Sequence, residues 1–136
     1  MIQRIQTVWM LFAAIAAFLT LKLSFYSGTL IADNAFHSLV AMEHFWLMIF
    51  TCAIATTIFI NIFLFKQRTI QFRIAISALL GECILIFMYM RQINNYSNGN
   101  FSFWAALHIF VFVFLIMAAV AIYKDDKLVK DSNRLR

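Results

Sequence analysis

The sequence predicts an all-α integral membrane protein, a four-helix bundle with both termini in the cytoplasm. Of its 136 residues, 64% are hydrophobic and only 12% are charged, whereas soluble domains are about half apolar and about a quarter charged. Four apolar runs each approach or exceed the roughly 20 residues that a spanning helix needs. Most of the lysines and arginines lie at the ends of these runs, on one predicted side of the bilayer.

The four predicted helices cover residues 5–25, 45–65, 69–90 and 101–123. Together with a charged cytoplasmic tail, residues 124–136, they form a single transmembrane domain. We expect the first run to be retained as a helix, because its alanine-rich stretch lies inside the run and not at a cleavable end. Proline is absent, which argues mildly against transport because transporters often use broken helices at their sites.

The basic residues predict the orientation of the chain. One side receives nine of them, and the other side receives only Lys22 and Arg91. Because lysine and arginine accumulate in cytoplasmic loops, both termini and the turn between the second and third helices are predicted to be cytoplasmic, in a multi-pass protein of a bacterial inner membrane. The nine residues are Arg4, Lys66, Arg68, Arg73, Lys124, Lys127, Lys130, Arg134 and Arg136.

The connections differ in length. The short turn at residues 66–69 predicts that the second and third helices are antiparallel neighbours. Residues 91–100 are predicted to form a polar outer loop. The outer segment 24–44 is compatible with a small hairpin around Ser27 and Gly28 or with a short interfacial helix, and the sequence leaves both open.

Glu82 lies in the middle of the apolar stretch LLGECILIF. A carboxyl group in hydrocarbon is costly without a partner. His108 in the fourth helix is expected at a similar depth, so a hydrogen bond between the two side chains is predicted. This intramembrane polar pair could lock the bundle, or it could handle protons or ions. Glu82 could instead contact another subunit.

The remaining histidines and the cysteines do not form a recognisable reactive set. His37 and His44 are seven residues apart, whereas helical metal ligands are more often three or four apart. Cys52 and Cys83 lack the C-x-x-C spacing of thiol oxidoreductases. We therefore expect no catalytic residue, cofactor or metal and no nucleic-acid partner, and the sequence identifies no small-molecule substrate.

The tail mixes charges of both signs at helical spacing. Asp126 precedes Lys130 by four residues, and Lys127 precedes Asp131 by four, which favours a helical extension of the fourth helix. Leu128 and Leu135 could form a narrow apolar stripe. The tail is either a solvated end or a docking surface for a cytoplasmic partner or the lipid face.

Three stretches carry a family resemblance: MIQRIQTVWML, FKQRTIQFRI and AIYKDDKLVKDSNRLR. In these stretches the sequence resembles an uncharacterised family of small four-helix membrane proteins from Bacteroidota, domain-of-unknown-function family 4293. The resemblance implies a four-helix inner-membrane protein and supplies no activity. The matching positions are Gln3, Arg4, Ile5, Gln6, Thr7, Lys66, Arg68, Gln71, Arg73, Asp125, Lys127, Leu128, Val129, Ser132, Arg134, Leu135 and Arg136.

These features favour a non-catalytic accessory or scaffold subunit of a larger inner-membrane complex, such as a translocation or respiratory assembly. Its expected partners are the lipid bilayer and other membrane protein subunits. The alternative is a small proton-responsive or ion- or solute-transporting protein centred on Glu82 and His108. The cytoplasmic docking candidates are Arg4, Arg68, Gln71, Arg73, Leu128, Arg134, Leu135 and Arg136.

Overall fold

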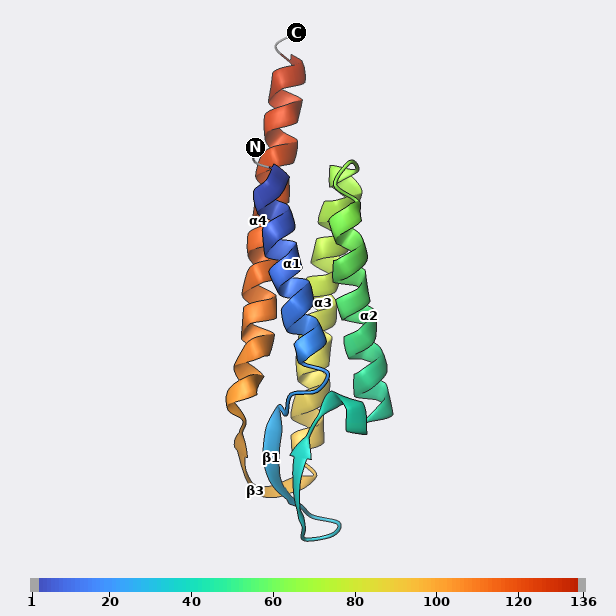
Figure 1. Ribbon diagram of the computed structural model, residues 1–136, viewed down its shortest axis with the longest axis vertical. Coiled ribbons are helices and arrows are strands. Elements are labelled where there is room, and N and C mark those ends of the chain that lie inside the picture. The colour runs from blue at the N-terminus through green and yellow to red at the C-terminus, as the bar shows by residue number, and fades with distance from the viewer. Residues whose placement is uncertain (1–2, 135–136) are drawn as a thin grey trace.

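The computed structural model describes residues 3–134, and the side chains of residues 5–131. Within this part of the chain, four α-helices run side by side and a small sheet lies at one end of them (Figure 1). Three of these helices are long and apolar enough to cross a membrane: α2 (Phe45–Phe63), α3 (Arg68–Ile93) and the segment Phe103–Asp131, which contains most of α4 (Ala106–Arg134). By length and composition, the chain is a membrane protein.

The first helix, α1 (Gln3–Leu19), is 17 residues long and ends before the predicted boundary at residue 25. The Thr20 hydroxyl donates a hydrogen bond to the Ala17 carbonyl at 2.7 Å, and a turn follows. The Phe25 backbone N–H then donates to the Leu39 carbonyl at 2.8 Å. Because Phe25 is already bonded to the neighbouring strand segment, the helix cannot extend through it.

The last helix begins later and ends later than predicted. Residues that were assigned to its start form the end of a strand and a short 3-10 helix, η2 (Phe103–Ala105). At its other end α4 continues through the charged tail to Arg134, for a total of 29 residues. The helical extension expected from the charge spacing is present, and Lys130 Nζ lies 2.6 Å from Asp126 Oδ2.

The helices pack in a ring, in which α1 contacts α4 and α2, and α3 contacts the same two helices. The packed faces are rich in alanine. In α1 all four alanines are buried, whereas Ile15 and Phe18 are exposed. Small residues at helix contacts and large apolar residues toward the outside are typical of membrane bundles, because lipid is as apolar as the core and close backbone approach drives packing.

The sheet corrects the all-α prediction. Its strands, β1 (Tyr26–Leu30), β2 (Phe36–Leu39) and β3 (Tyr96–Phe101), are antiparallel in the order β2-β1-β3. The outer loop predicted at residues 91–100 therefore contains the end of α3 and most of β3. A 3-10 helix, η1 (Ala41–Glu43), leads from β2 toward α2.

The outer segment does contain a hairpin, but its turn is not at Ser27 and Gly28. The turn lies after β1, where Asn34 adopts φ 50°. Gly28 instead faces β3, and a Cβ placed on it would lie 2.8 Å from the Gly99 Cα atom. Glycine is required at Gly28 because the two strands approach too closely there for a side chain.

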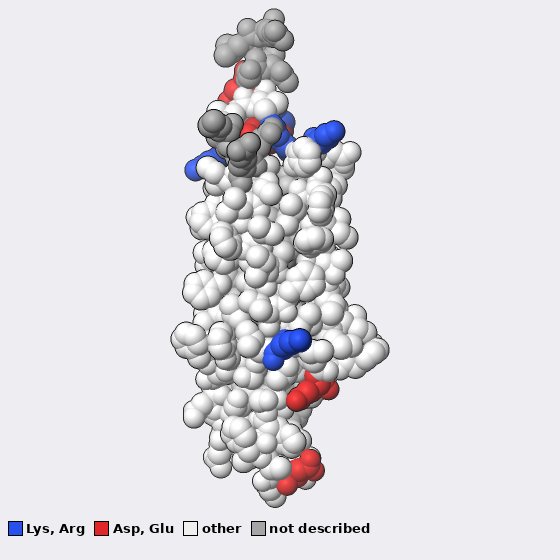
Figure 2. Space-filling model, viewed as in Figure 1, with Lys and Arg blue, Asp and Glu red and all other residues white. Residues whose placement is uncertain are grey.

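Charged residues gather at the ends of the molecule. Figure 2 shows a long uncharged band across this face of the bundle, with basic residues above it near the turn between α2 and α3. The N-terminal end of α1, this turn and the C-terminal end of α4 all lie at the end opposite the sheet (Figure 1). We call this the charged end of the bundle.

Candidate functional site

Glu82 and His108 meet between α3 and α4. Glu82 lies near the middle of α3, and His108 lies near the start of α4. The two helices are antiparallel neighbours, and these two side chains lie at one level of the bundle. The distance between His108 Nδ1 and Glu82 Oε1 is 2.7 Å, and His108 and Glu82 are 3% and 2% exposed, respectively. The structure thus brings together the two residues that the sequence suggested as partners.

Two aromatic rings enclose the imidazole. The His108 ring centroid lies 5.3 Å from that of Phe25 and 5.1 Å from that of Tyr89, both in edge-on geometry. Phe25 and Tyr89 stack on each other at 4.5 Å. Tyr89 lies on the same buried face of α3 as Glu82. Phe25 comes from a segment that is distant in the sequence, so no local pattern predicts its contact with His108.

A buried carboxyl and an imidazole at this distance form a hydrogen bond. The pair is neutral overall either as a carboxylate with an imidazolium or as a carboxylic acid with a neutral imidazole. Apolar surroundings disfavour a net charge. The arrangement can therefore act as a polar link between α3 and α4, and it can also hold an exchangeable proton.

At the charged end, α2 and α3 are joined by reciprocal amide contacts. The Asn61 side chain donates to the Gln71 carbonyl at 3.1 Å, and the Gln71 side chain donates to the Asn61 carbonyl at 3.2 Å. Gln71 also lies 3.5 Å from the Met10 sulfur in α1. Gln71 is fully buried, so its assignment as a surface docking residue is wrong: its amide is held by backbone carbonyl and sulfur acceptors between the helices.

The remaining docking candidates differ in their exposure. Arg73 is exposed on α3, and Leu128 is exposed on the tail. Arg68 is partly buried and paired with Asp125 of α4. The side chains of Arg4 and Arg134, and the whole of Leu135 and Arg136, lie outside the described residues.

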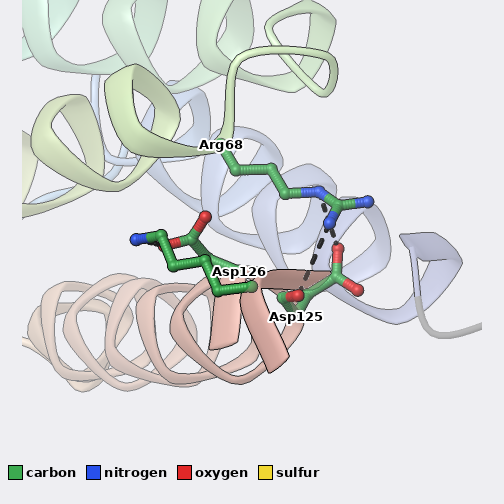
Figure 3. A network of polar contacts seen from close by, with 4 residues as sticks. Arg68, Asp125 and Asp126 are labelled. Atoms are coloured by element: carbon green, nitrogen blue, oxygen red, sulfur yellow. Dashed lines mark hydrogen bonds and ion pairs between the residues drawn. The ribbon is translucent and has the colours of Figure 1, made fainter. Parts of the chain in front are cut away.

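Arg68 connects the turn between α2 and α3 to the base of the α4 extension (Figure 3). Its Nε atom lies 3.1 Å from Asp125 Oδ2, and its Nη1 donates to the Asp125 carbonyl at 3.4 Å. A cavity of about 590 Å³ lies beside this contact, with Lys66, Asp126 and Val129 in its lining. The contact between Arg68 and Asp125 was not predicted, although Asp125 follows the buried Ile122 by three residues, on the same helix face.

The other histidines and the cysteines do not take part in the contact between Glu82 and His108. His37 is exposed in β2, and His44 lies before α2, where its Nδ1 is 3.4 Å from the Gln92 amide nitrogen. Cys52 and Cys83 are free thiols. Within the described part of the chain, no three His, Cys, Asp or Glu side chains are grouped as metal ligands.

Replacing Glu82 tests whether the pair stabilises the bundle. Glu82→Leu should lower the free energy of unfolding by about 1–3 kcal/mol, because it leaves a buried imidazole without its partner. Glu82→Gln should cost less, since an amide still offers a hydrogen bond. Unfolding by SDS titration in mixed micelles, followed by circular dichroism, measures the difference.

The matched control is Glu43→Leu, which removes an exposed carboxylate outside the long helices and should leave stability nearly unchanged. A Glu82→Leu variant as stable as the Glu43→Leu variant would contradict a structural role for the pair.

Comparison with known proteins gives a family without a function. No curated protein matches the chain, and no solved structure does. One family covers almost the whole sequence, matching residues 2–135, and its description is domain of unknown function (DUF4293). Since this match spans well over half of the sequence, the chain belongs to the DUF4293 family.

Proposed function

We propose that this protein is a non-catalytic accessory or scaffold subunit of a larger inner-membrane complex, such as a translocation or respiratory assembly. In this proposal the chain crosses the membrane four times, the charged end of the bundle faces the cytoplasm, and α4 docks a neighbouring membrane subunit beyond the bilayer. The observation that carries the proposal is the braced extension of α4.

The length of α4 supports this role. At about 1.5 Å per residue, a helix of 29 residues extends roughly 43 Å, whereas the hydrocarbon core is about 30 Å thick. Figure 1 shows α4 projecting beyond the start of α1 and beyond the turn between α2 and α3. A helix that leaves the bundle presents a surface that the described part of the chain does not cover.

The extension is held in place and is not uniformly polar. The contact between Arg68 and Asp125 fixes its base (Figure 3), and Lys130, one turn beyond Asp126, pairs with it. Beyond this base, Leu128 is 54% exposed and Val129 is 41% exposed. Adjacent apolar side chains on a braced, charged helix suit the contact face of a partner subunit with an apolar centre and a charged rim.

The orientation rests on charge. Among residues with described side chains, the charged end carries Lys66, Arg68, Arg73, Lys124, Lys127 and Lys130. The opposite end carries Lys22 and Arg91. Retention of lysine and arginine in the cytoplasm then favours the arrangement with the α4 extension inside the cell.

A double substitution tests the docking surface. A variant carrying both Leu128→Glu and Val129→Glu should reduce the amount of co-purifying membrane partner at least about tenfold, a loss of about 1.4 kcal/mol or more in binding free energy. The added carboxylates would have to be desolvated at the contact. The measurement is quantitative mass spectrometry after gentle-detergent purification from native membranes.

The control is Phe36→Glu, which adds a carboxylate at an apolar side chain that is 72% exposed in the sheet. It should retain the partner. Wild-type protein that migrates alone, or a partner retained by the double variant, would refute the docking role.

The second candidate function is a proton-responsive or transporting membrane protein, which the buried contact between Glu82 and His108 favours. In vesicles containing a pH-sensitive dye, wild-type protein would then dissipate a pH gradient faster than Glu82→Gln, because an amide cannot exchange the carboxyl proton. Equal rates for wild type, variant and protein-free vesicles would exclude this function. If the Glu82→Gln variant recovers the same amount of partner as the wild type, the proton-responsive function is independent of docking.

A further inference from the structure

An apolar cavity of about 500 Å³ opens beside the pair of Glu82 and His108, on the outer half of the bundle. It lies between α3, the start of α4 and the segments that lead to the sheet. Ile109 and Phe103 are exposed at its rim, and Ile109 belongs to a membrane-spanning helix. The cavity therefore opens toward the lipid. Its main lining residues are Phe25, Ile86, Phe101, Phe103, His108 and Ile109.

His108 supplies this cavity with a polar group. The residue is buried, and its Nδ1 is occupied by Glu82 at 2.7 Å. No residue in the described part of the chain forms a hydrogen bond to its other ring nitrogen, Nε2. Both neutral arrangements of the pair place a hydrogen on Nε2: the carboxylate with the imidazolium, and the carboxylic acid with the neutral imidazole. The cavity therefore offers a hydrogen-bond donor to a molecule in the lipid phase.

The walls define the shape of the ligand. Four of the lining side chains are rings, and Phe25 and Phe101 meet edge to face at 6.0 Å. Aromatic walls favour a flat conjugated ring over a flexible acyl chain. Pockets of this size, apolar with one or two polar groups, are typical of small-molecule sites.

We propose that this cavity binds a lipid-soluble quinone. One ring carbonyl accepts a hydrogen bond from His108 Nε2–H, the ring lies among Phe25, Phe101 and Phe103, and the apolar tail extends past Ile109 into the lipid. The site is distinct from the α4 extension and does not depend on the docking function.

Binding is measured with decylubiquinone and the full chain in nanodiscs of phosphatidylethanolamine and phosphatidylglycerol. The readout is saturable quenching of tryptophan fluorescence, since Trp104 lies next to the rim and its ring is 5.8 Å from that of Phe103. His108→Phe keeps a ring but removes the donor, and it should weaken binding roughly fivefold to tenfold, as expected for one hydrogen bond. His37→Phe, at an exposed position in β2, should bind like the wild type.

A second variant keeps the pair of Glu82 and His108 intact. Ala106→Phe places a ring in the cavity, where Ala106 forms part of the lining, and should abolish saturable quenching. This variant decides the question if His108→Phe does not fold. Wild-type affinity in the folded variants would overturn the proposal. The proposal would also be overturned by two results together. These are the absence of saturable quenching in the wild type and the detection, by native mass spectrometry, of a bound phospholipid that Ala106→Phe displaces.

Discussion

The absence of water inside a bilayer is the constraint on which this structure depends, because a polar group between the helices can only be satisfied by the chain itself. Several buried side chains meet this requirement, and they do so in two ways. Thr51 bonds back to the Leu47 carbonyl of its own helix at 2.7 Å, whereas Glu82 and Gln71 reach across to neighbouring helices. The cross-helix contacts cost little where they are paired, and they fix which helix faces lie together.

The polar groups at the two ends of the bundle are paired in different ways. At one end, the backbone between helices pairs in a small sheet, and Phe25, which precedes β1, packs into the helical core by stacking on Tyr89. At the charged end, the helices are joined by side chains, first through the amides of Asn61 and Gln71 and then through Arg68 and Asp125. The α4 extension starts from this braced layer, which is why we assign it the docking role.

Much of the helical architecture can be predicted from the sequence because helix periodicity and the cost of burying charge are local signals. These signals marked Glu82 and, at a similar depth in the next helix, His108. The strand β3 could not be predicted, since its residues read as a polar loop and become a strand only by pairing with β1. Gln71 was misassigned for a related reason: a glutamine beside basic residues suggests a surface, and the acceptors of its amide nitrogen, the Asn61 carbonyl and the Met10 sulfur, lie on other helices.

The proposed threading of the chain, which places the charged end in the cytoplasm, underlies the proposed function. It is tested most directly by cysteine labelling in spheroplasts, after Cys52 and Cys83 are replaced by alanine. Single cysteines are introduced at three exposed positions: Asp33 in the hairpin turn, Gln67 between α2 and α3, and Lys127 on the α4 extension. A membrane-impermeant maleimide should label Asp33→Cys in intact spheroplasts, and Gln67→Cys and Lys127→Cys only after permeabilisation. Labelling of Lys127→Cys in intact spheroplasts would contradict the account.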